Sequence, residues 1–180
     1  MNDWYMASDS PELVEFGTAR GLGVTGVGEP GGAEHLAAIQ AIYMVAAPLL
    51  SNELPPLEGR WWVETDQRPL TVPRSQWRWH LFLRLPEWVE PARVDETRQA
   101  TGSASAARVQ LVMFTEGLCV QAMHHGSYDE EPATLARMDQ FMAERRLANN
   151  GLHHEIYLSD LTETDRSKMR TILRQPVRET

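Results

Sequence analysis

The sequence predicts an α+β fold of two similar β-α-β-β units, whose antiparallel sheets carry helices on one face and border a central aromatic-lined cleft with the other. Three observations predict it. Strand-like and helix-like segments follow each other in the same order in both halves of the chain. Short sequences recur at matching places in the two halves. Five of the six tryptophans fall between Trp61 and Trp88, which suggests an aromatic core or an aromatic-walled pocket.

The length of 180 residues suits one domain, or two small halves that share a core. We expect a polar lead-in over residues 1–12 and a single domain over residues 13–178. The two pseudo-symmetric halves of this domain are expected at about 13–89 and 108–178.

Charge and cysteine content exclude several classes of protein. Twenty-five acidic against 17 basic residues give a net charge of −8, which argues against a nucleic-acid partner and is compatible with attraction of cations. The single cysteine, Cys119, excludes an internal disulfide and a cysteine-based zinc site. No apolar run reaches the ~18 residues of a membrane span, and residues 1–12 lack the features of a signal peptide. We therefore expect a cytoplasmic protein without a membrane partner.

The first half begins with a glycine-interrupted, strand-like segment over residues 13–27 and a glycine-rich loop over residues 28–32. Apolar residues at steps of three and four then predict a helix over residues 33–50. Tyr43 lies on the apolar stripe of this helix, so its hydroxyl needs either a partner in the core or a pocket to face.

Two strands complete the first half. Residues 60–64 form the first, and its neighbouring Trp61 and Trp62 must face opposite sides of the sheet. One of these rings is expected in the core and the other on the second face. Residues 77–85 form the second strand, with Trp79 among the apolar side chains of one face.

The second half repeats this order after an intervening helix over residues 90–100. Residues 109–115 and 118–125 are expected as a hairpin, with Glu116 as a residue of its turn. The remaining expected elements are a helix over 132–147, a strand over 153–158, a polar turn over 159–167 and a last strand over 169–177.

The strand at residues 153–158 carries the most suggestive pair of side chains. Successive side chains of a strand point to opposite faces, so Glu155 and Tyr157 share one face while Ile156 and Leu158 share the other. Glu155 and Tyr157 are then either part of a solvated face or the polar end of a binding site. In the predicted repeat, residues 61–63 match residues 156–158, so Trp62 would face Glu155 and Tyr157 across the cleft.

Metal and nucleophile chemistry have weak support. The histidine pairs at 124–125 and 153–154 consist of neighbours that point to opposite strand faces, so neither pair can chelate as it stands. A serine nucleophile lacks its usual Gly-x-Ser-x-Gly context. We expect neither a metal nor an organic cofactor.

Several segments together resemble the GyrI-like small-molecule-binding domain family. They are residues 124–132 (HHGSYDEEP), 155–160 (EIYLSD) and 173–177 (LRQPV), while residues 58–62 and 77–79 resemble a stand-alone branch of that family. The resemblance covers residues 13–177. Ser127 stands where the family usually has a proline, and His125 where an apolar residue is usual; both bear on the shape of the helix entry.

The resemblance implies a duplicated fold whose central cleft holds aromatic side chains and a glutamate, which Glu155 matches. Relatives bind bulky, often cationic, aromatic compounds, and some stand-alone members hydrolyse the cyclopropane ring of DNA-alkylating natural products. In that case Glu155 would be the base, with Tyr157 and Tyr43 as hydrogen-bond donors. Trp62, Trp79 and Met113 would line the ligand, although Trp61 competes with Trp62 for the cleft.

Three functions therefore stay open: a cofactor-independent cyclopropanoid hydrolase that serves detoxification or self-resistance, a non-catalytic drug-binding module, and a protein partner of a topoisomerase. The scattered acidic residues give the third the least support, because imitation of nucleic acid needs massed negative charge.

Overall fold

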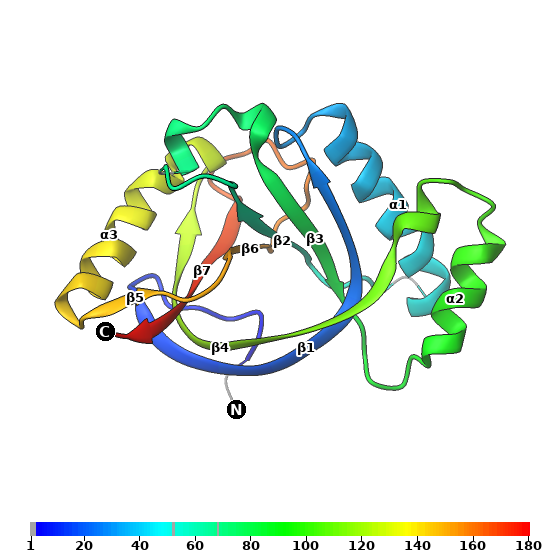
Figure 1. The fold of residues 1–180 in the computed structure, drawn as a ribbon, viewed down its shortest axis with the longest axis horizontal. Coiled ribbons are helices and arrows are strands. Elements are labelled where there is room, and N and C mark those ends of the chain that lie inside the picture. Colours follow the sequence, from blue (N-terminus) through cyan, green and yellow to red (C-terminus); the bar gives the residue numbers. More distant parts are fainter. Residues whose placement is uncertain (1–2, 52, 68) are drawn as a thin grey trace. The chain divides into compact units, whose positions relative to one another are not determined.

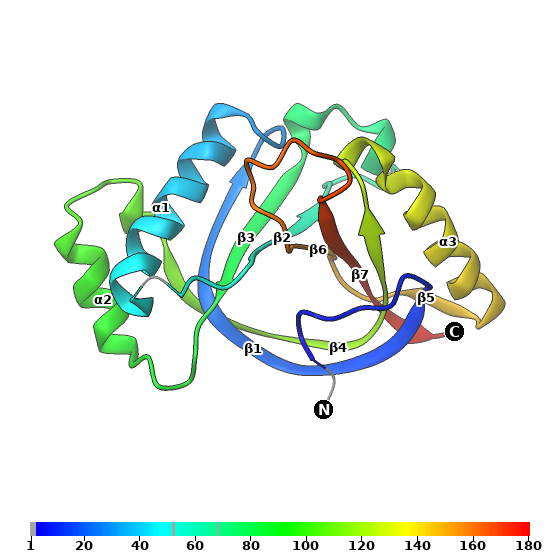
Figure 2. The ribbon, with the colours of Figure 1, turned by 180° about the vertical axis from the view of Figure 1, so that it is seen from behind.

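The computed structural model describes residues 3–51, 53–67 and 69–180, which form seven β-strands, three α-helices and four short 3-10 turns. The chain divides into two compact units (Figures 1 and 2). We call Ala19–Phe114 the Trp79 unit, and Met1–Thr18 together with Thr115–Thr180 the Glu155 unit. The long strands β1 (Glu12–Val27) and β4 (Gln110–His125) each contribute residues to both units. The α+β class is thereby confirmed.

In the Trp79 unit, β3 is the central strand. Its bounds and those of its neighbours are β2 (Leu57–Trp62), β3 (Arg78–Arg84), α1 (Ala33–Leu50) and α2 (Pro91–Ala100). Antiparallel pairing joins β3 to β1 on one side and to β2 on the other, so that Leu81 lies opposite both Val24 and Gly59. Both helices pack against each other, and α1 also contacts β3.

Burial explains why β3 is central. The five residues between its two terminal arginines are all buried, as in a strand covered on both faces. Trp79 packs tightly over Gly26 of β1: a Cβ added at Gly26 would lie 2.1 Å from the Trp79 ring. The missing side chain of Gly26 is therefore what admits the indole.

In the Glu155 unit, β7 is central. The elements of this unit besides β4 are α3 (Glu131–Glu144), β5 (Leu147–Asn149), β6 (His153–Tyr157) and β7 (Arg170–Glu179). Antiparallel pairing joins β7 to β4, to β6 and, near its end, to β5. The helix α3 packs against β4 and β7 through a shared core of Val120, Ala122, Met138, Met142, Leu173 and Val177. The central strand β7 thus supports β6 and is itself held by β4 and by the core under α3.

Three local expectations are wrong. The hairpin expected around Glu116 is absent, because β4 continues without reversal from Gln110 to His125. Gly117 takes φ = 72° within that strand, a value that glycine adopts without steric cost, so it does not end the strand. Trp4, in the expected polar lead-in, is buried. The helix expected over 132–147 ends at Glu144, and Leu147 instead begins the unexpected strand β5. The duplication, the domain boundaries and the central cleft stay predictions.

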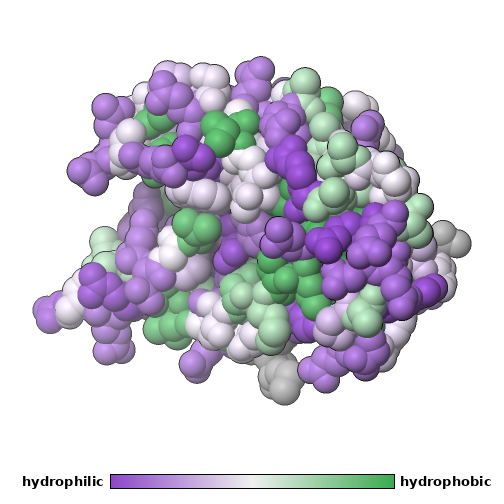
Figure 3. Space-filling model, turned by 45° about the vertical axis from the view of Figure 1, so that its right-hand side comes forward, coloured by the Kyte–Doolittle hydropathy of each residue, from purple (hydrophilic) through white to green (hydrophobic). Residues whose placement is uncertain are grey.

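The hydropathy of α1 also corrects an expectation. This helix has 18 residues and a mean hydropathy of 1.3, so by length and composition alone it could cross a membrane. However, 44% of it is buried within the structure, and core helices of globular domains pass the same test. The molecular face in Figure 3 is mostly hydrophilic, with hydrophobic side chains in small patches. The packing of α1 against α2 and β3 therefore accounts for its buried apolar residues, while Leu36 and Met44 are exposed.

Candidate ligand site around Glu155

Glu155 and Tyr157 lie together on one face of β6. The Tyr157 hydroxyl donates a hydrogen bond to Glu155 Oε2 at 2.7 Å, while Ile156 between them is fully buried on the other face. The predicted alternation along this strand is confirmed. The Glu155 side chain is only 15% exposed, so the carboxylate is largely removed from water. A solvated strand face is therefore the wrong interpretation.

His153 extends the same row of side chains. Its Nε2 lies 3.5 Å from Glu155 Oε1, so each carboxylate oxygen of Glu155 has a polar neighbour. Residues two apart on a strand share a face, which is why the sequence His-x-Glu-x-Tyr places an imidazole, a carboxylate and a phenol in line. This row can hold a proton donor and a proton acceptor beside one ligand.

A second acidic residue, Glu131, belongs to the surroundings of Glu155. It lies at the start of α3 with 9% of its surface exposed, and its buried Oε1 has no hydrogen-bond partner. Burial, followed by the charges of Glu155 and Asp129, raises the pKa of Glu131 to about 9. Glu131 therefore carries a proton at neutral pH.

Tyr128 connects the start of α3 to β6. Its ring meets the ring of Tyr157 edge-on, with centroids 5.9 Å apart. Burial, and then the charges of Glu131 and Glu155, raise the pKa of the Tyr128 hydroxyl. Aromatic surface and acidic groups thus meet in one place, a combination that suits aromatic cations.

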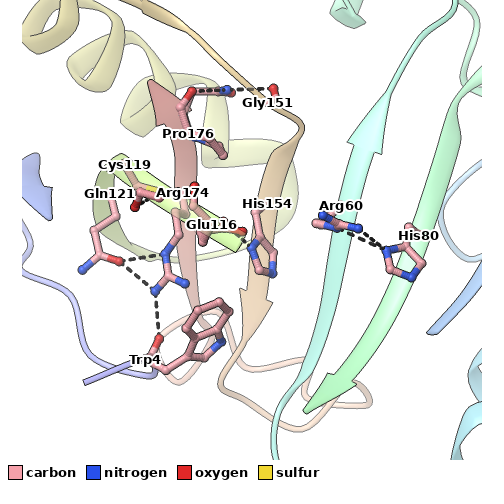
Figure 4. Close-up of polar contacts among 12 residues, drawn as sticks. Trp4, Arg60, His80, Glu116, Cys119, Gln121, Gly151, His154, Arg174 and Pro176 are labelled. Atoms are coloured by element: carbon pink, nitrogen blue, oxygen red, sulfur yellow. Dashed lines mark hydrogen bonds and ion pairs between the residues drawn. The ribbon is translucent and has the colours of Figure 1, made fainter. Parts of the chain in front are cut away.

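A buried hydrogen bond between two ionisable side chains supports β6 from its other face. His154 Nδ1 lies 2.7 Å from Glu116 Oε1, and the two side chains are 0% and 2% exposed (Figure 4). Glu116 is thus a structural partner from β4, not the turn residue expected from the sequence. The pair therefore holds the face of β6 that points away from Glu155.

Arg174 of β7 forms the next buried polar group (Figure 4). Its guanidinium donates to Gln121 Oε1 at 2.9 and 3.0 Å and to the Trp4 carbonyl at 2.8 Å. It also lies over the Phe16 ring, 3.9 Å from the centroid. These contacts explain why the segment around Trp4 belongs to this unit.

The unusual residues at the entry to α3 build a cap. The backbone N–H and hydroxyl of Ser127 both donate to Glu130 Oε2, at 2.9 and 2.8 Å, in a capping-box arrangement. These hydrogen bonds lower the pKa of Glu130. His125 pairs with Asp9 at 2.6 Å. Ser127 and Glu130 therefore fix the chain at the entry to this helix.

The other predicted site residues belong to the Trp79 unit. Tyr43 and Trp62 are half-buried, Trp79 is fully buried with its ring 5.3 Å from His35, and Met113 is 66% exposed. Trp61, the alternative to Trp62, is buried. Their ligand-binding roles and their convergence with Glu155 in one cleft stay predictions.

The Trp79 unit also contains a polar pair on neighbouring strands. Arg60 of β2 donates to His80 Nδ1 of β3 at 2.7 and 3.1 Å (Figure 4), and its guanidinium lies 3.7 Å from the centroid of the Phe114 ring. Within residues 3–51, 53–67 and 69–180, no three His, Cys, Asp or Glu side chains are grouped so that they could hold a metal ion.

The raised pKa of Glu131 predicts a pH-dependent stability. Between the ordinary carboxyl value of 4.5 and about 9, the folded protein binds more protons than the unfolded chain, so stability must fall as pH rises. Glu131→Gln has no carboxyl group at this position, so it lacks this contribution to the pH dependence of the free energy of unfolding. Between pH 5 and 8.5 the free energy of unfolding of the wild type should fall by at least about 1 kcal/mol more than that of the variant, since one pKa unit corresponds to about 1.4 kcal/mol. Urea unfolding at both pH values measures the difference, and parallel profiles would contradict it.

Comparisons with known proteins agree with this description. The family model of the GyrI-like small molecule binding domain matches residues 92–178. An uncharacterized conserved protein from Listeria innocua is 36% identical, with a TM-score of 0.86, and the match covers 97% of this chain and 95% of that chain. A hydrolase from Listeria innocua is 35% identical over the same shares, with a TM-score of 0.81.

More distant structures share the fold alone. One of them is SAV2435 bound to tetraphenylphosphonium, which is 13% identical with a TM-score of 0.53 and 94% coverage of both chains. No curated protein shows significant similarity. The fold and the matches define a small-molecule-binding domain. The chain belongs to the GyrI-like small-molecule-binding domain family.

Proposed function

We propose that this protein binds bulky hydrophobic or cationic aromatic molecules beside Glu155 and hydrolyses the cyclopropane ring of cyclopropanoid genotoxins. The observation that carries the proposal is the largely buried Glu155 carboxylate, held by the Tyr157 hydroxyl at 2.7 Å. The similarity to a Listeria innocua hydrolase over nearly the whole chain supports a hydrolytic activity. Such an activity would serve detoxification or self-resistance in the cytoplasm.

The surroundings of Glu155 suit an aromatic cation. A carboxylate with little access to water gains from a cationic partner, because the surrounding medium screens their attraction poorly. Each aromatic ring near the cation adds about 0.5–2 kcal/mol of cation–π attraction, and the Tyr128 and Tyr157 rings lie together here. SAV2435, which shares the fold, binds the aromatic cation tetraphenylphosphonium.

The same groups supply what ring opening requires. Glu155 accepts a proton from water, and the water oxygen attacks a carbon of the strained ring. The electrons of the broken carbon–carbon bond move to the conjugated carbonyl, whose oxygen then receives a proton. One water is added in total, and the relief of strain drives the reaction without a cofactor. His153 and Tyr157 lie beside the base, and Tyr43 is the further donor predicted from the sequence.

A non-catalytic drug-binding module is the second candidate. It is favoured by the hydrogen bond from Tyr157, which holds the Glu155 side chain in one position beside the aromatic rings, where it can serve as the counter-ion of a bound cation. The two candidates share the same site and differ in whether the bound molecule is changed.

Mass spectrometry of a cyclopropanoid incubated with the protein separates the candidates. The hydrolase predicts a product heavier by one water that accumulates above the spontaneous background. A bound but unchanged compound would overturn the hydrolase and support the binding module. Absence of both product and binding would overturn both candidates.

A further inference from the structure

Glu131 is a buried acidic group that has no part in the proposed reaction. An acidic residue at a helix start ordinarily faces solvent and offsets the helix macrodipole. Glu131 is instead nine-tenths buried, and its Oε1 has no hydrogen-bond partner. Neighbouring Glu130 provides the contrast, since it is half-exposed, caps the helix entry through Ser127 and approaches Arg166.

Two side-chain contacts connect the turn before Glu131 to the Glu155 site. Tyr128, three residues earlier on the same turn, meets the Tyr157 ring, and Tyr157 in turn donates to Glu155. The ring contact therefore joins the turn that leads into Glu131 to the strand that carries Glu155. Burial, and then the charges of Glu131 and Glu155, raise the pKa of the Tyr128 hydroxyl. Glu131 also feels the charge of Glu155 directly.

We propose that Glu131 is the second acidic residue of the ligand site, and that it releases a proton when a lipophilic aromatic cation binds beside Glu155. The inference rests on the cation binding in the proposed function. In the empty site Glu131 is a neutral carboxylic acid, because its burial, and then the charges of Glu155 and Asp129, raise its pKa. A bound cation offsets the second charge, so the Glu131 proton leaves to the buffer and the site gains one carboxylate.

Other ionisable groups around Glu131 define the necessary controls. They are Asp129 and Glu130 on its own turn, Tyr128 beside them, His124 and Arg137 near Thr134 of α3, Arg166 next to Glu130, and Glu155, His153 and Tyr157 on β6. Among these, His153 is the rival source of a proton, because its Nε2 lies 3.5 Å from Glu155. A cation could displace a proton from that imidazole instead.

Calorimetric titration with tetraphenylphosphonium, in two buffers of different ionisation enthalpy at pH 7.5, counts the protons released. For the wild type we expect about one proton per bound cation, and an affinity that rises up to about tenfold per pH unit below pH 9. Glu131→Gln should bind the same probe with no release and no such pH dependence. Glu130→Gln is the matched control, since glutamine preserves a capping box, and it should behave as the wild type.

Two further measurements complete the test. The neutral probe triphenylphosphine oxide should bind the wild type without proton release, and His153→Gln should keep the release. Proton release that survives in Glu131→Gln, or disappears in His153→Gln, overturns the inference and leaves the proposed function in place. If tetraphenylphosphonium binds the wild type without release of a proton, the inference is likewise overturned and the proposed function stays in place. Absence of binding overturns the cation-binding part of the proposed function together with the inference. Thermal melts establish that each variant is folded.

Discussion

Glu116→Ala is expected to destabilise the protein by about 3 kcal/mol, since it leaves the buried His154 without its hydrogen-bond partner and opens a cavity. His154 is fully buried and would lose the carboxylate 2.7 Å from its Nδ1, while the space vacated by Glu116 would remain in the core. Chemical denaturation at neutral pH measures this loss. Because β6 is fixed through this pair, ligand affinity should fall together with stability.

Two controls test whether the pair itself causes the effect. Replacing both partners, with Glu116→Met and His154→Leu, should recover most of the lost stability, because apolar side chains of similar shape often replace a buried hydrogen-bonded pair at little cost. Lys168→Ala breaks an exposed ion pair with Asp165 in the same unit and should leave stability nearly unchanged. A loss below 1 kcal/mol for Glu116→Ala would show that the buried pair is not a determinant of the fold.

Local patterns along the chain are enough to predict α1 and the two faces of β6. The apolar steps over residues 33–50 give a helix whose ends agree with the structure, since helix periodicity and burial act on the same side chains. The alternation from His153 to Tyr157 likewise predicts which side chains meet, and the hydrogen bond between Tyr157 and Glu155 follows from it. These features depend only on neighbours in the sequence.

Buried polar groups could not be predicted in the same way. Glu116 beside Gly117 has the local pattern of a turn, and only the pairing of β4 with β7 and the position of His154 make it a buried partner. Trp4 lies among polar residues, and its partner Arg174 is 170 positions away. Such contacts depend on the tertiary fold, for which local periodicity carries no signal.

Glu131 was missed for a different reason. Acidic residues at the start of a helix have a sufficient local explanation in the macrodipole, and Asp129, Glu130 and Glu131 all satisfy it. The structure separates them, because Glu130 points to the cap at Ser127 whereas Glu131 is buried. Three consecutive acids exceed what a cap needs, and this excess was the available signal.

Glu155→Gln is expected to lower the rate of cyclopropane hydrolysis at least about 100-fold while neutral aromatic ligands keep their affinity. Glutamine has the shape of glutamate and still offers an oxygen to the Tyr157 hydroxyl, so the geometry around β6 is preserved. It cannot accept a proton from water, and this is the step that the proposal assigns to Glu155. Single-turnover rates by mass spectrometry and tryptophan quenching measure the two quantities separately.

Whether Glu155→Gln changes the hydrolysis rate or the ligand affinity decides between the two roles of Glu155, a base or a counter-ion. A base is needed only in the transition state, so its loss lowers the rate and leaves neutral ligands bound, whereas a counter-ion acts in the ground state and its loss weakens cations selectively. Glu144→Gln makes the same chemical change at an exposed position of α3 and should alter neither quantity. Unchanged turnover in Glu155→Gln would remove the base, and weakened binding of tetraphenylphosphonium alone would then leave Glu155 as a counter-ion in a drug-binding module.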